Sequence, residues 1–397
     1  MRKIEIEEWG KSNPESLNVD EVHNLEKTEY FILEPVADKK FLIRPREGVV
    51  GIISPSPALT VFVRPRWPCA SVLKLAAYAY GVDTALAVPL PARLAWGGAL
   101  DWLALLLVLE VERLLAHGIR YGYHETFEEV QQVRGRIAFH RLNPRHEARA
   151  VLPCLFTDFS PSTLENRIIR GCLEIVDRFP LSPELHAKVR SALSAFRTVQ
   201  PVYPSPQLFE RVHLHRLNAH YEGVLRICRM IAEGIGVELS PGSVPSPSLF
   251  IKMSDLFERG VERALREAVL EHHAQPRYTK FLVCRGNGEA KGLEFVPDNV
   301  LGPKEAPQLV VDAKYKDPST WHSVDLYQAL IYAASLRART VLVYPQVDTP
   351  IRVSVEWQGL GARVDVVTVD LSTDPIQALR TFGREMRRLL EEQPNYN

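Results

Sequence analysis

The spacing of hydrophobic and polar residues predicts three regions along the chain. Short apolar runs interrupted by glycine and proline, such as FLIRP, VVGII and LTVFVRP within residues 41–65, predict a small β-rich region. Apolar residues then recur at helical spacing over residues 86–200. The longest of these runs, residues 98–117, ends before Gly118, which is typical of a helix C-terminus. Helical and extended patterns alternate after residue 254, so the fold class predicted for the last region is α/β.

These patterns divide the chain into three expected domains. We place a β-rich domain at residues 1–84, a mainly helical region at 85–245 and an α/β domain at 246–397. The second boundary falls in residues 239–248, which are rich in proline, glycine and serine. Further helices are expected at residues 162–179, 183–199 and 208–234, the first with Ser162 and Glu165 at capping-box spacing.

One predicted strand carries charges inside an apolar run. In residues 309–316, LVVDAKYK, a period of two places Asp312, Lys314 and Lys316 on the same face. Charged groups in an apolar strand cost stability unless they pair, bind a metal or face a cleft. This strand is therefore the main candidate for a functional site.

A second carboxylate stands a short distance upstream of the strand. Asp298, in the pair Pro297-Asp298, and Asp312 supply two hard oxygen ligands, which suit Mg²⁺. Such an ion polarises a phosphoryl oxygen during phosphodiester hydrolysis, and Lys314 can position water or stabilise developing charge. A third acid could be Glu258 or Glu262, which lie one turn apart on a predicted helix.

Other features limit the range of functions. Gln328 and Tyr332 share a helix face, where they could contact a nucleotide or orient the metal site. The formal net charge is +0, so attraction to nucleic-acid phosphates must come from local clusters or from a partner subunit. The arginines of residues 134–149 could contact DNA or a partner, or could equally form a solvated, salt-bridged face.

The cysteines and the apolar runs indicate the compartment. The 5 cysteines include no C-x-x-C pair, which argues against zinc and iron–sulfur sites and favours buried thiols in a reducing compartment. The N-terminus lacks the apolar stretch of a secretory signal, and the most apolar run, residues 102–109, is too short to span a bilayer. We therefore expect a cytoplasmic protein.

The order of these residues resembles a known family of nucleases. Glu258, Pro297-Asp298, Asp312-x-Lys314 and Gln328-x-x-x-Tyr332 follow the order of the PD-(D/E)xK nucleases of the RecB-like type. The segments VVDAKYK, DLYQALIYA and GVVGIISPSPALTVFVRPRW resemble the McrC family, the nuclease subunits of modification-dependent McrBC restriction systems. The chain carries Arg66 where that family usually has lysine.

The resemblance implies that the C-terminal and N-terminal parts of the chain have different functions. The C-terminal domain is expected to be a PD-(D/E)xK domain, a mixed sheet flanked by helices, that hydrolyses DNA phosphodiesters with Mg²⁺. Its metal ligands would be Asp298, Asp312 and Glu258, and the further site residues would be Lys314, Gln328 and Tyr332. The N-terminal part is expected to bind and stimulate an McrB-type hexameric GTPase, which recognises methylated double-stranded DNA, and McrC–McrC contacts between complexes are possible. The chain itself has no G-x-x-x-x-G-K-[ST] loop, which argues against its own hydrolysis of GTP.

Two other functions remain open from the sequence. The chain could be a non-cutting adaptor that activates the GTPase and carries a degenerate nuclease fold. It could also be a stand-alone RecB-like nuclease that cuts DNA without an NTPase.

Overall fold

The structure is a computed structural model, which describes residues 2–28, 30–46, 48–56, 58–86, 88, 96–234, 249–282, 291–318, 323–359 and 361–392. The chain forms two compact units. Unit 1 consists of Met1–Trp96 together with Gly234–Asn397, and unit 2 consists of Gly97–Glu233. Unit 2 is thus an insertion into unit 1, whereas the division into three domains stays a prediction. None of the helices within the described ranges is long and apolar enough to cross a membrane.

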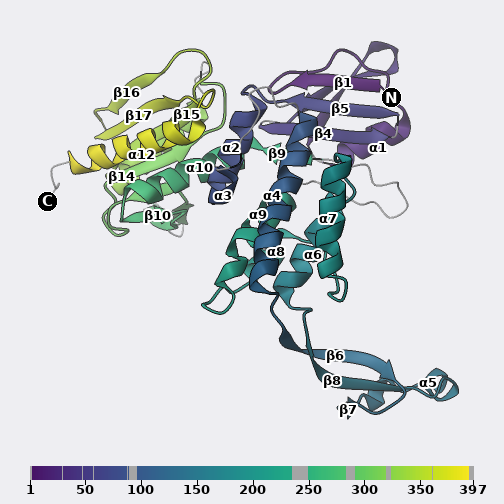
Figure 1. Cartoon of the computed structure of the whole chain (residues 1–397). Helices are drawn as coiled ribbons and strands as arrows, with labels where there is room; N and C mark the ends of the chain where they lie inside the picture. The colour runs from purple at the N-terminus through teal and green to yellow at the C-terminus, as the bar shows by residue number, and fades with distance from the viewer. Residues whose placement is uncertain are drawn as a thin grey trace. The chain divides into compact units, whose positions relative to one another are not determined.

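The N-terminal sheet of unit 1 has four strands in the order β1 (Arg2–Glu7), β5 (Leu59–Arg64), β4 (Val49–Ser56) and β9 (Leu249–Lys252). Strand β1 is parallel to β5, and the other neighbours are antiparallel (Figure 1). Helix α1 (Val19–Lys27) and the strand pair β2 (Phe31–Val36) and β3 (Lys40–Pro45) accompany the sheet. The predicted β-rich region is confirmed, but its fourth strand comes from a segment that we had placed in the C-terminal domain.

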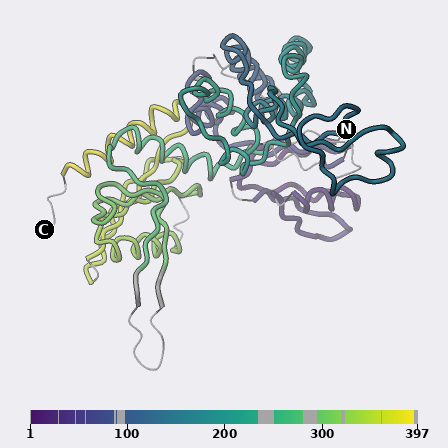
Figure 2. The backbone as a smooth tube through the Cα atoms, turned by 90° about the horizontal axis from the view of Figure 1, so that it is seen from below, coloured from purple at the N-terminus to yellow at the C-terminus, as the bar shows by residue number. Residues whose placement is uncertain are grey.

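The second sheet of unit 1 has six strands and contains the predicted charged strand. Their order is β10 (His272–Ala274), β13 (Asn299–Leu301), β14 (Leu309–Ala313), β15 (Arg339–Pro345), β17 (Ala362–Val369) and β16 (Arg352–Trp357). The three strands β14, β15 and β17 are parallel to one another, β13 and β16 are antiparallel to them, and β10 is antiparallel to β13, so the sheet is mixed. A separate antiparallel pair, β11 (Tyr278–Leu282) and β12 (Lys291–Phe295), runs side by side in Figure 2.

Helices cover the six-stranded sheet and connect it with the N-terminal part. Helix α11 (Ser323–Leu336) joins β14 to β15 and packs Ala329 and Ala333 into a core with residues of β15 and β17. Helix α10 (Met253–Ala268) packs against α12 (Pro375–Glu391) and α2 (Cys69–Ala79), and α3 (Asp83–Leu86) follows α2. A Cβ at Gly383 would lie 2.5 Å from the Ala264 carbonyl oxygen, so glycine is what allows α12 to approach α10 this closely.

Unit 2 combines a helical bundle with an arm of β-structure. The bundle contains α4 (Trp96–His117), α6 (Leu164–Val176), α7 (Pro183–Ala195), α8 (Pro206–Glu210) and α9 (Glu222–Gly234). The arm, residues Gly122 to Ser160, contains β6 (Gly122–Val130), β7 (Arg136–Ile137), α5 (Pro144–Ala148) and β8 (Leu152–Ser160), with β8 paired between β6 and β7. Figure 1 shows the arm extending away from the helices of this unit.

Two predictions for unit 2 are wrong. The expected helix over residues 208–234 is broken, because α8 ends at Glu210 and α9 begins only at Glu222. The capping residue of α6 is Thr163, whose side chain accepts a hydrogen bond from the Asn166 N–H, and not Ser162. The Glu165 carboxylate accepts hydrogen bonds from Arg120 and Asn218.

Several smaller expectations can also be compared with the structure. The four described cysteines are buried and free, as expected, while Cys284 and the linker at residues 239–248 lie outside the described residues. The arginines of residues 134–149 include residues with local partners: Arg134 lies 3.6 Å from Asp158, and Arg141 stacks over Phe127. These contacts agree with the salt-bridged alternative.

Candidate active site

The two predicted aspartates lie on neighbouring antiparallel strands. Asp298 directly precedes β13, and Asp312 is the fourth residue of β14. The Ala313 N–H donates a hydrogen bond of 2.8 Å to Asp298 Oδ2, which fixes this carboxylate beside the strand that carries Asp312. The Asp312 side chain is almost fully buried. The sheet therefore brings together two carboxylates that are fourteen positions apart along the chain.

Lys314 completes this group from the end of β14. Its Nζ lies 2.6 Å from Asp312 Oδ2, so the predicted same-face arrangement of these two residues is confirmed. Burial acts to lower the pKa of Lys314, but the Asp312 and Asp298 carboxylates outweigh it and raise this pKa above its usual value. The ammonium group therefore stays charged at neutral pH.

Lys316 does not belong to the same group, contrary to the strand pattern. Its Nζ donates to both carboxylate oxygens of Asp325, at 3.0 and 3.2 Å. Strand β14 ends at Ala313, so Lys314 and Lys316 both follow it, and they differ in the carboxylate that each contacts. A second, separate ion pair results.

The site concentrates more negative charge than its one lysine neutralises. Burial, Asp312 and Glu258 raise the pKa of Asp298 to about 8, against the lowering effect of the Ala313 N–H and of Lys314. Neither carboxylate oxygen of Asp312 accepts a hydrogen bond with good geometry, although both are buried. Buried polar atoms without a hydrogen-bond partner are rare in folded proteins, and Lys314 offsets only one of the negative charges, so the group suits an additional cation.

Glu258, on α10, is the third acid near this group. Its carboxylate is among the charges that raise the pKa of Asp298, whereas Glu262 forms an ion pair with Arg266. Gln275 holds Glu258 in place, because its side-chain amide donates to Glu258 Oε1 at 2.9 Å. The Gln275 N–H also bonds the Asp298 carbonyl oxygen at 2.8 Å. The geometry thus favours Glu258 over Glu262.

Gln275 is a site residue that the sequence did not reveal. It lies in the short connection between β10 and β11, where no periodic pattern marks it. Its φ of 45° falls in the left-handed region, which non-glycine residues rarely adopt. Such outliers cluster at functional sites, but they are visible only in the structure.

Gln328 and Tyr332 lie on one face of α11, as predicted, and bond each other. The Gln328 side-chain amide donates to the Tyr332 hydroxyl at 2.6 Å. The Tyr332 ring packs against Phe295 with a centroid distance of 5.6 Å and is nearly fully buried. Burial and the nearby Asp312 carboxylate raise the Tyr332 pKa. Tyr332 is therefore both a core residue and a neighbour of the acidic group.

The donor set fits a hard cation. Among the described residues, no three His, Cys, Asp or Glu side chains converge closely enough to make a complete ligand cage. Mg²⁺ does not require one, since it is commonly bound by one or two carboxylates and completes its shell with water and substrate phosphates. Asp298 and Asp312 supply those two carboxylates; Asp312 Oδ1 is buried without a hydrogen-bond partner, whereas Oδ2 lies 2.6 Å from Lys314 Nζ.

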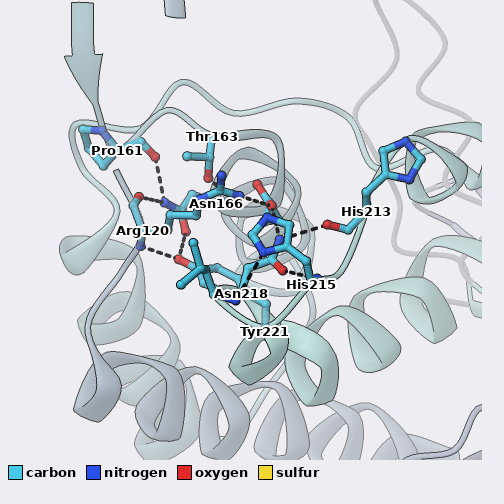
Figure 3. Close-up of polar contacts among 10 residues, drawn as sticks. Arg120, Pro161, Thr163, Asn166, His213, His215, Asn218 and Tyr221 are labelled. Atoms are coloured by element: carbon cyan, nitrogen blue, oxygen red, sulfur yellow. Dashed lines mark hydrogen bonds and ion pairs between the residues drawn. The ribbon is translucent and has the colours of Figure 1, made fainter. Parts of the chain in front are cut away.

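A second polar cluster, in unit 2, lies at the base of the arm (Figure 3). The Asn166 side-chain amide donates to the carbonyl oxygens of Arg120, before β6, and Pro161, after β8, at 2.9 and 2.7 Å. The Tyr221 hydroxyl donates to Asn166 Oδ1 at 2.9 Å. One fully buried side chain therefore ties together both ends of the arm.

Asn218 plays a matching role for the segment between α8 and α9. Its side-chain amide donates to Glu165 Oε1 at 3.0 Å and to the His213 carbonyl oxygen at 3.1 Å. Its own Oδ1 accepts a hydrogen bond of 2.6 Å from the His215 N–H (Figure 3). These bonds satisfy backbone groups of the irregular segment, which explains why it is not helical.

Comparison with solved structures shows the fold to which the chain is similar. It matches a chain from a refined half-complex of a tetradecameric assembly of Thermococcus gammatolerans McrB AAA+ hexamers with bound McrC. The TM-score is 0.54 at 16% sequence identity, over 98% of this chain and 99% of that chain. A cryo-EM structure of the Thermococcus gammatolerans McrBC complex gives a TM-score of 0.40 at 17% identity, over 67% of this chain and 88% of that chain. No curated protein matches the chain.

The family comparison covers most of the sequence. The model of the McrBC 5-methylcytosine restriction system component matches residues 46–345, a range that begins just before β4 and ends with β15. It therefore includes the arm, the helical bundle and all six predicted site residues. The chain belongs to the family of McrBC 5-methylcytosine restriction system components.

Proposed function

We propose that this chain is the Mg²⁺-dependent endonuclease subunit of a modification-dependent restriction complex and that residues 246–397 form its PD-(D/E)xK nuclease domain. The observation that carries the proposal is the buried group of Asp298, Asp312 and Lys314, in which Lys314 Nζ lies 2.6 Å from Asp312. Two carboxylates and one lysine beside neighbouring strands of a mixed sheet are groups that suit metal-assisted phosphodiester hydrolysis. The family membership agrees with this function.

Each residue of the site has a distinct role in the proposal. Bound Mg²⁺ supplies Lewis-acid polarisation of the phosphoryl oxygen and lowers the pKa of water. Asp298 and Asp312 hold the ion, and Glu258 adds negative charge beside Asp298. Because its pKa is raised, Lys314 acts as a fixed positive charge that stabilises the phosphate and not as a base. Gln328 and Tyr332 border the group from α11.

The partner in the proposal is an McrB-type GTPase ring, which delivers methylated double-stranded DNA to a chain that has no net positive charge. The similar chain from Thermococcus gammatolerans belongs to an assembly of McrB AAA+ hexamers with bound McrC. The arm of unit 2 exposes large aromatic side chains, including Tyr123, Phe139 and Phe159. Exposed aromatic groups of this kind are typical of protein-binding surfaces. We therefore assign the binding and stimulation of the ring to the part of the chain before residue 246.

The proposal is tested by separating cleavage from GTPase stimulation. Asp312→Ala and Lys314→Ala should abolish Mg²⁺-dependent cleavage of methylated DNA by the reconstituted complex, while the stimulated GTPase rate stays at the wild-type level. Lys304→Ala, which removes an exposed lysine, serves as the control and should cut normally. Full cleavage by either site variant would refute the assignment.

The same assay distinguishes the other functions. A wild-type chain that binds and stimulates the ring without nicking DNA under any metal condition would be an adaptor. Cleavage by the chain alone, at the same rate with and without the GTPase, would identify a stand-alone nuclease.

A further inference from the structure

Tyr315, the residue after Lys314, sits in a cluster of aromatic rings that come from distant parts of unit 1. Its ring centroid lies 5.6 Å from that of Trp9, 5.6 Å from that of Trp67 and 6.0 Å from that of Phe257. Trp9 and Trp67 also meet edge to face at 6.1 Å. We call these four residues the aromatic junction. Because Trp9 follows β1 and Trp67 precedes α2, two of the four rings belong to the N-terminal part of the chain.

The junction includes residues of two of the three segments that carry the charged groups of the site. Tyr315 is the neighbour of Lys314 in sequence, and Phe257 is the neighbour of Glu258. Tyr315 and Phe257 are both buried, so their positions are set by packing. Aromatic pairs of this geometry also attract one another beyond the burial of their area. A shift of the N-terminal rings would therefore move the chain on both sides of the acidic group.

A polar contact joins the same N-terminal parts of the chain. The Glu8 carboxylate accepts a hydrogen bond of 3.1 Å from the Arg66 N–H, which links the residues next to Trp9 and Trp67. Burial and the nearby Glu8 carboxylate raise the pKa of Tyr315 above its usual value. The Arg66 N–H therefore holds the Glu8 carboxylate close to the aromatic junction.

The backbone of the N-terminal sheet also approaches Tyr315 closely. A Cβ at Gly48, where φ is 73°, would lie 3.2 Å from Tyr315 Cδ1. The Gly48 carbonyl oxygen accepts a hydrogen bond of 2.6 Å from the N–H of Met253, the first residue of α10. The turn before β4 is therefore attached to the helix that carries Glu258 and packs against the ring next to Lys314.

We propose that Tyr315 is a positioning residue of the active site and that Trp9 and Trp67 hold it, so that the N-terminal region sets the geometry of Lys314 and Glu258. This inference rests on the proposed nuclease function. In this proposal the N-terminal region contributes to DNA cleavage as well as to partner binding. It also means that the C-terminal domain does not position its own site without the N-terminal rings.

The first test measures cleavage by full-length variants in the complex. Trp9→Leu and Tyr315→Leu keep an apolar side chain but remove a ring, and each should lower kcat at saturating Mg²⁺ and DNA by about 10- to 100-fold, because small misplacements of catalytic groups have effects of this size. Trp9→Phe should restore most of the rate. Phe31→Leu is the matched control, because Phe31 is buried in the N-terminal core and its ring meets Phe250 instead of the junction. At a comparable loss of thermal stability, Phe31→Leu should cut normally.

The second test measures binding of Mg²⁺ alone by calorimetry, which needs no cleavage. Trp9→Leu and Tyr315→Leu should weaken Mg²⁺ binding by about 10-fold, because changes to residues that orient metal ligands have effects of this size. Phe31→Leu should leave the Mg²⁺ affinity unchanged. Wild-type cleavage and wild-type Mg²⁺ affinity in both junction variants would overturn the positioning role, provided that Asp312→Ala is inactive. Cleavage by Asp312→Ala would instead overturn the nuclease assignment on which the inference rests.

Discussion

Asn166→Ala removes the one side chain that ties together both ends of the arm. The change deletes three hydrogen bonds: two donated to the carbonyl oxygens of Arg120 and Pro161, and one accepted from the Tyr221 hydroxyl. Asn166 is fully buried, so water does not readily replace the lost partners. The expected result is a large loss of stability in unit 2.

The size of the loss follows from the number of bonds. A buried hydrogen bond contributes about 0.5–1.5 kcal/mol net, and three of them give roughly 2–4 kcal/mol. Tyr221→Phe removes two bonds, the one to Asn166 and one from the Arg120 N–H at 2.6 Å, so its loss should be about two thirds as large. For a unit of this size, about 1 kcal/mol lowers Tm by roughly 3–5 °C.

The assay is thermal and denaturant unfolding of the full chain, followed by circular dichroism. Asn166→Asp adds a diagnostic pH dependence, because the introduced carboxyl would face two carbonyl oxygens and bind its proton more tightly when folded. The folded state would then retain a proton that the unfolded state releases above about pH 4. The deficit of Asn166→Asp relative to wild type should therefore grow between pH 4 and pH 8.

Two results would refute this reasoning. A loss below about 1 kcal/mol for Asn166→Ala would show that the three bonds do not act as the structure indicates. A deficit of Asn166→Asp that is independent of pH would show that its carboxyl is solvated and that the site is open to water.

Two further predictions concern unit 1. Burial raises the pKa of Glu8 to about 7 from 4.5, so the folded state binds a proton that the unfolded state has lost. The free energy of unfolding should therefore fall by up to about 3 kcal/mol as pH rises from 4.5 to 7. Glu8→Gln should remove this pH dependence of unfolding, and an unchanged dependence would contradict the raised pKa. Gln275→Ala should weaken calorimetric Mg²⁺ binding by about 10-fold through the loss of its bond to Glu258, whereas equal affinity in wild type and variant would exclude that role.

Local patterns were sufficient for part of the fold and of the site. The period of two in residues 309–316 correctly placed Asp312 and Lys314 together, because both lie at the end of one strand and need no distant partner to share a face. The same pattern did not reveal the partner of Lys316, because that partner is Asp325 of α11. Periodicity describes a strand but does not show where tertiary contacts end it.

Features that depend on distant segments could not be predicted. Asn218 keeps the chain before α9 irregular by bonding Glu165, which lies 53 positions away in the sequence. Gln275 reaches the acidic group only because β10 and β13 pair. Strand β9 is short, with four residues, and it is recognisable as a strand only from its pairing with β4. In each case the deciding partner is remote in the chain.

The pairing of β9 with β4 has a consequence for synthesis of the chain on the ribosome. Strand β4 ends at Ser56, but its neighbour begins at Leu249, after all of unit 2. In the nascent chain, the β4 edge of the N-terminal sheet therefore stays unpaired while Gly97–Glu233 is translated and can already fold. An uncovered edge is prone to pairing with other chains. A slow passage through the insertion would prolong this exposure, so translation speed and chaperone access at that stage should influence the yield of folded protein.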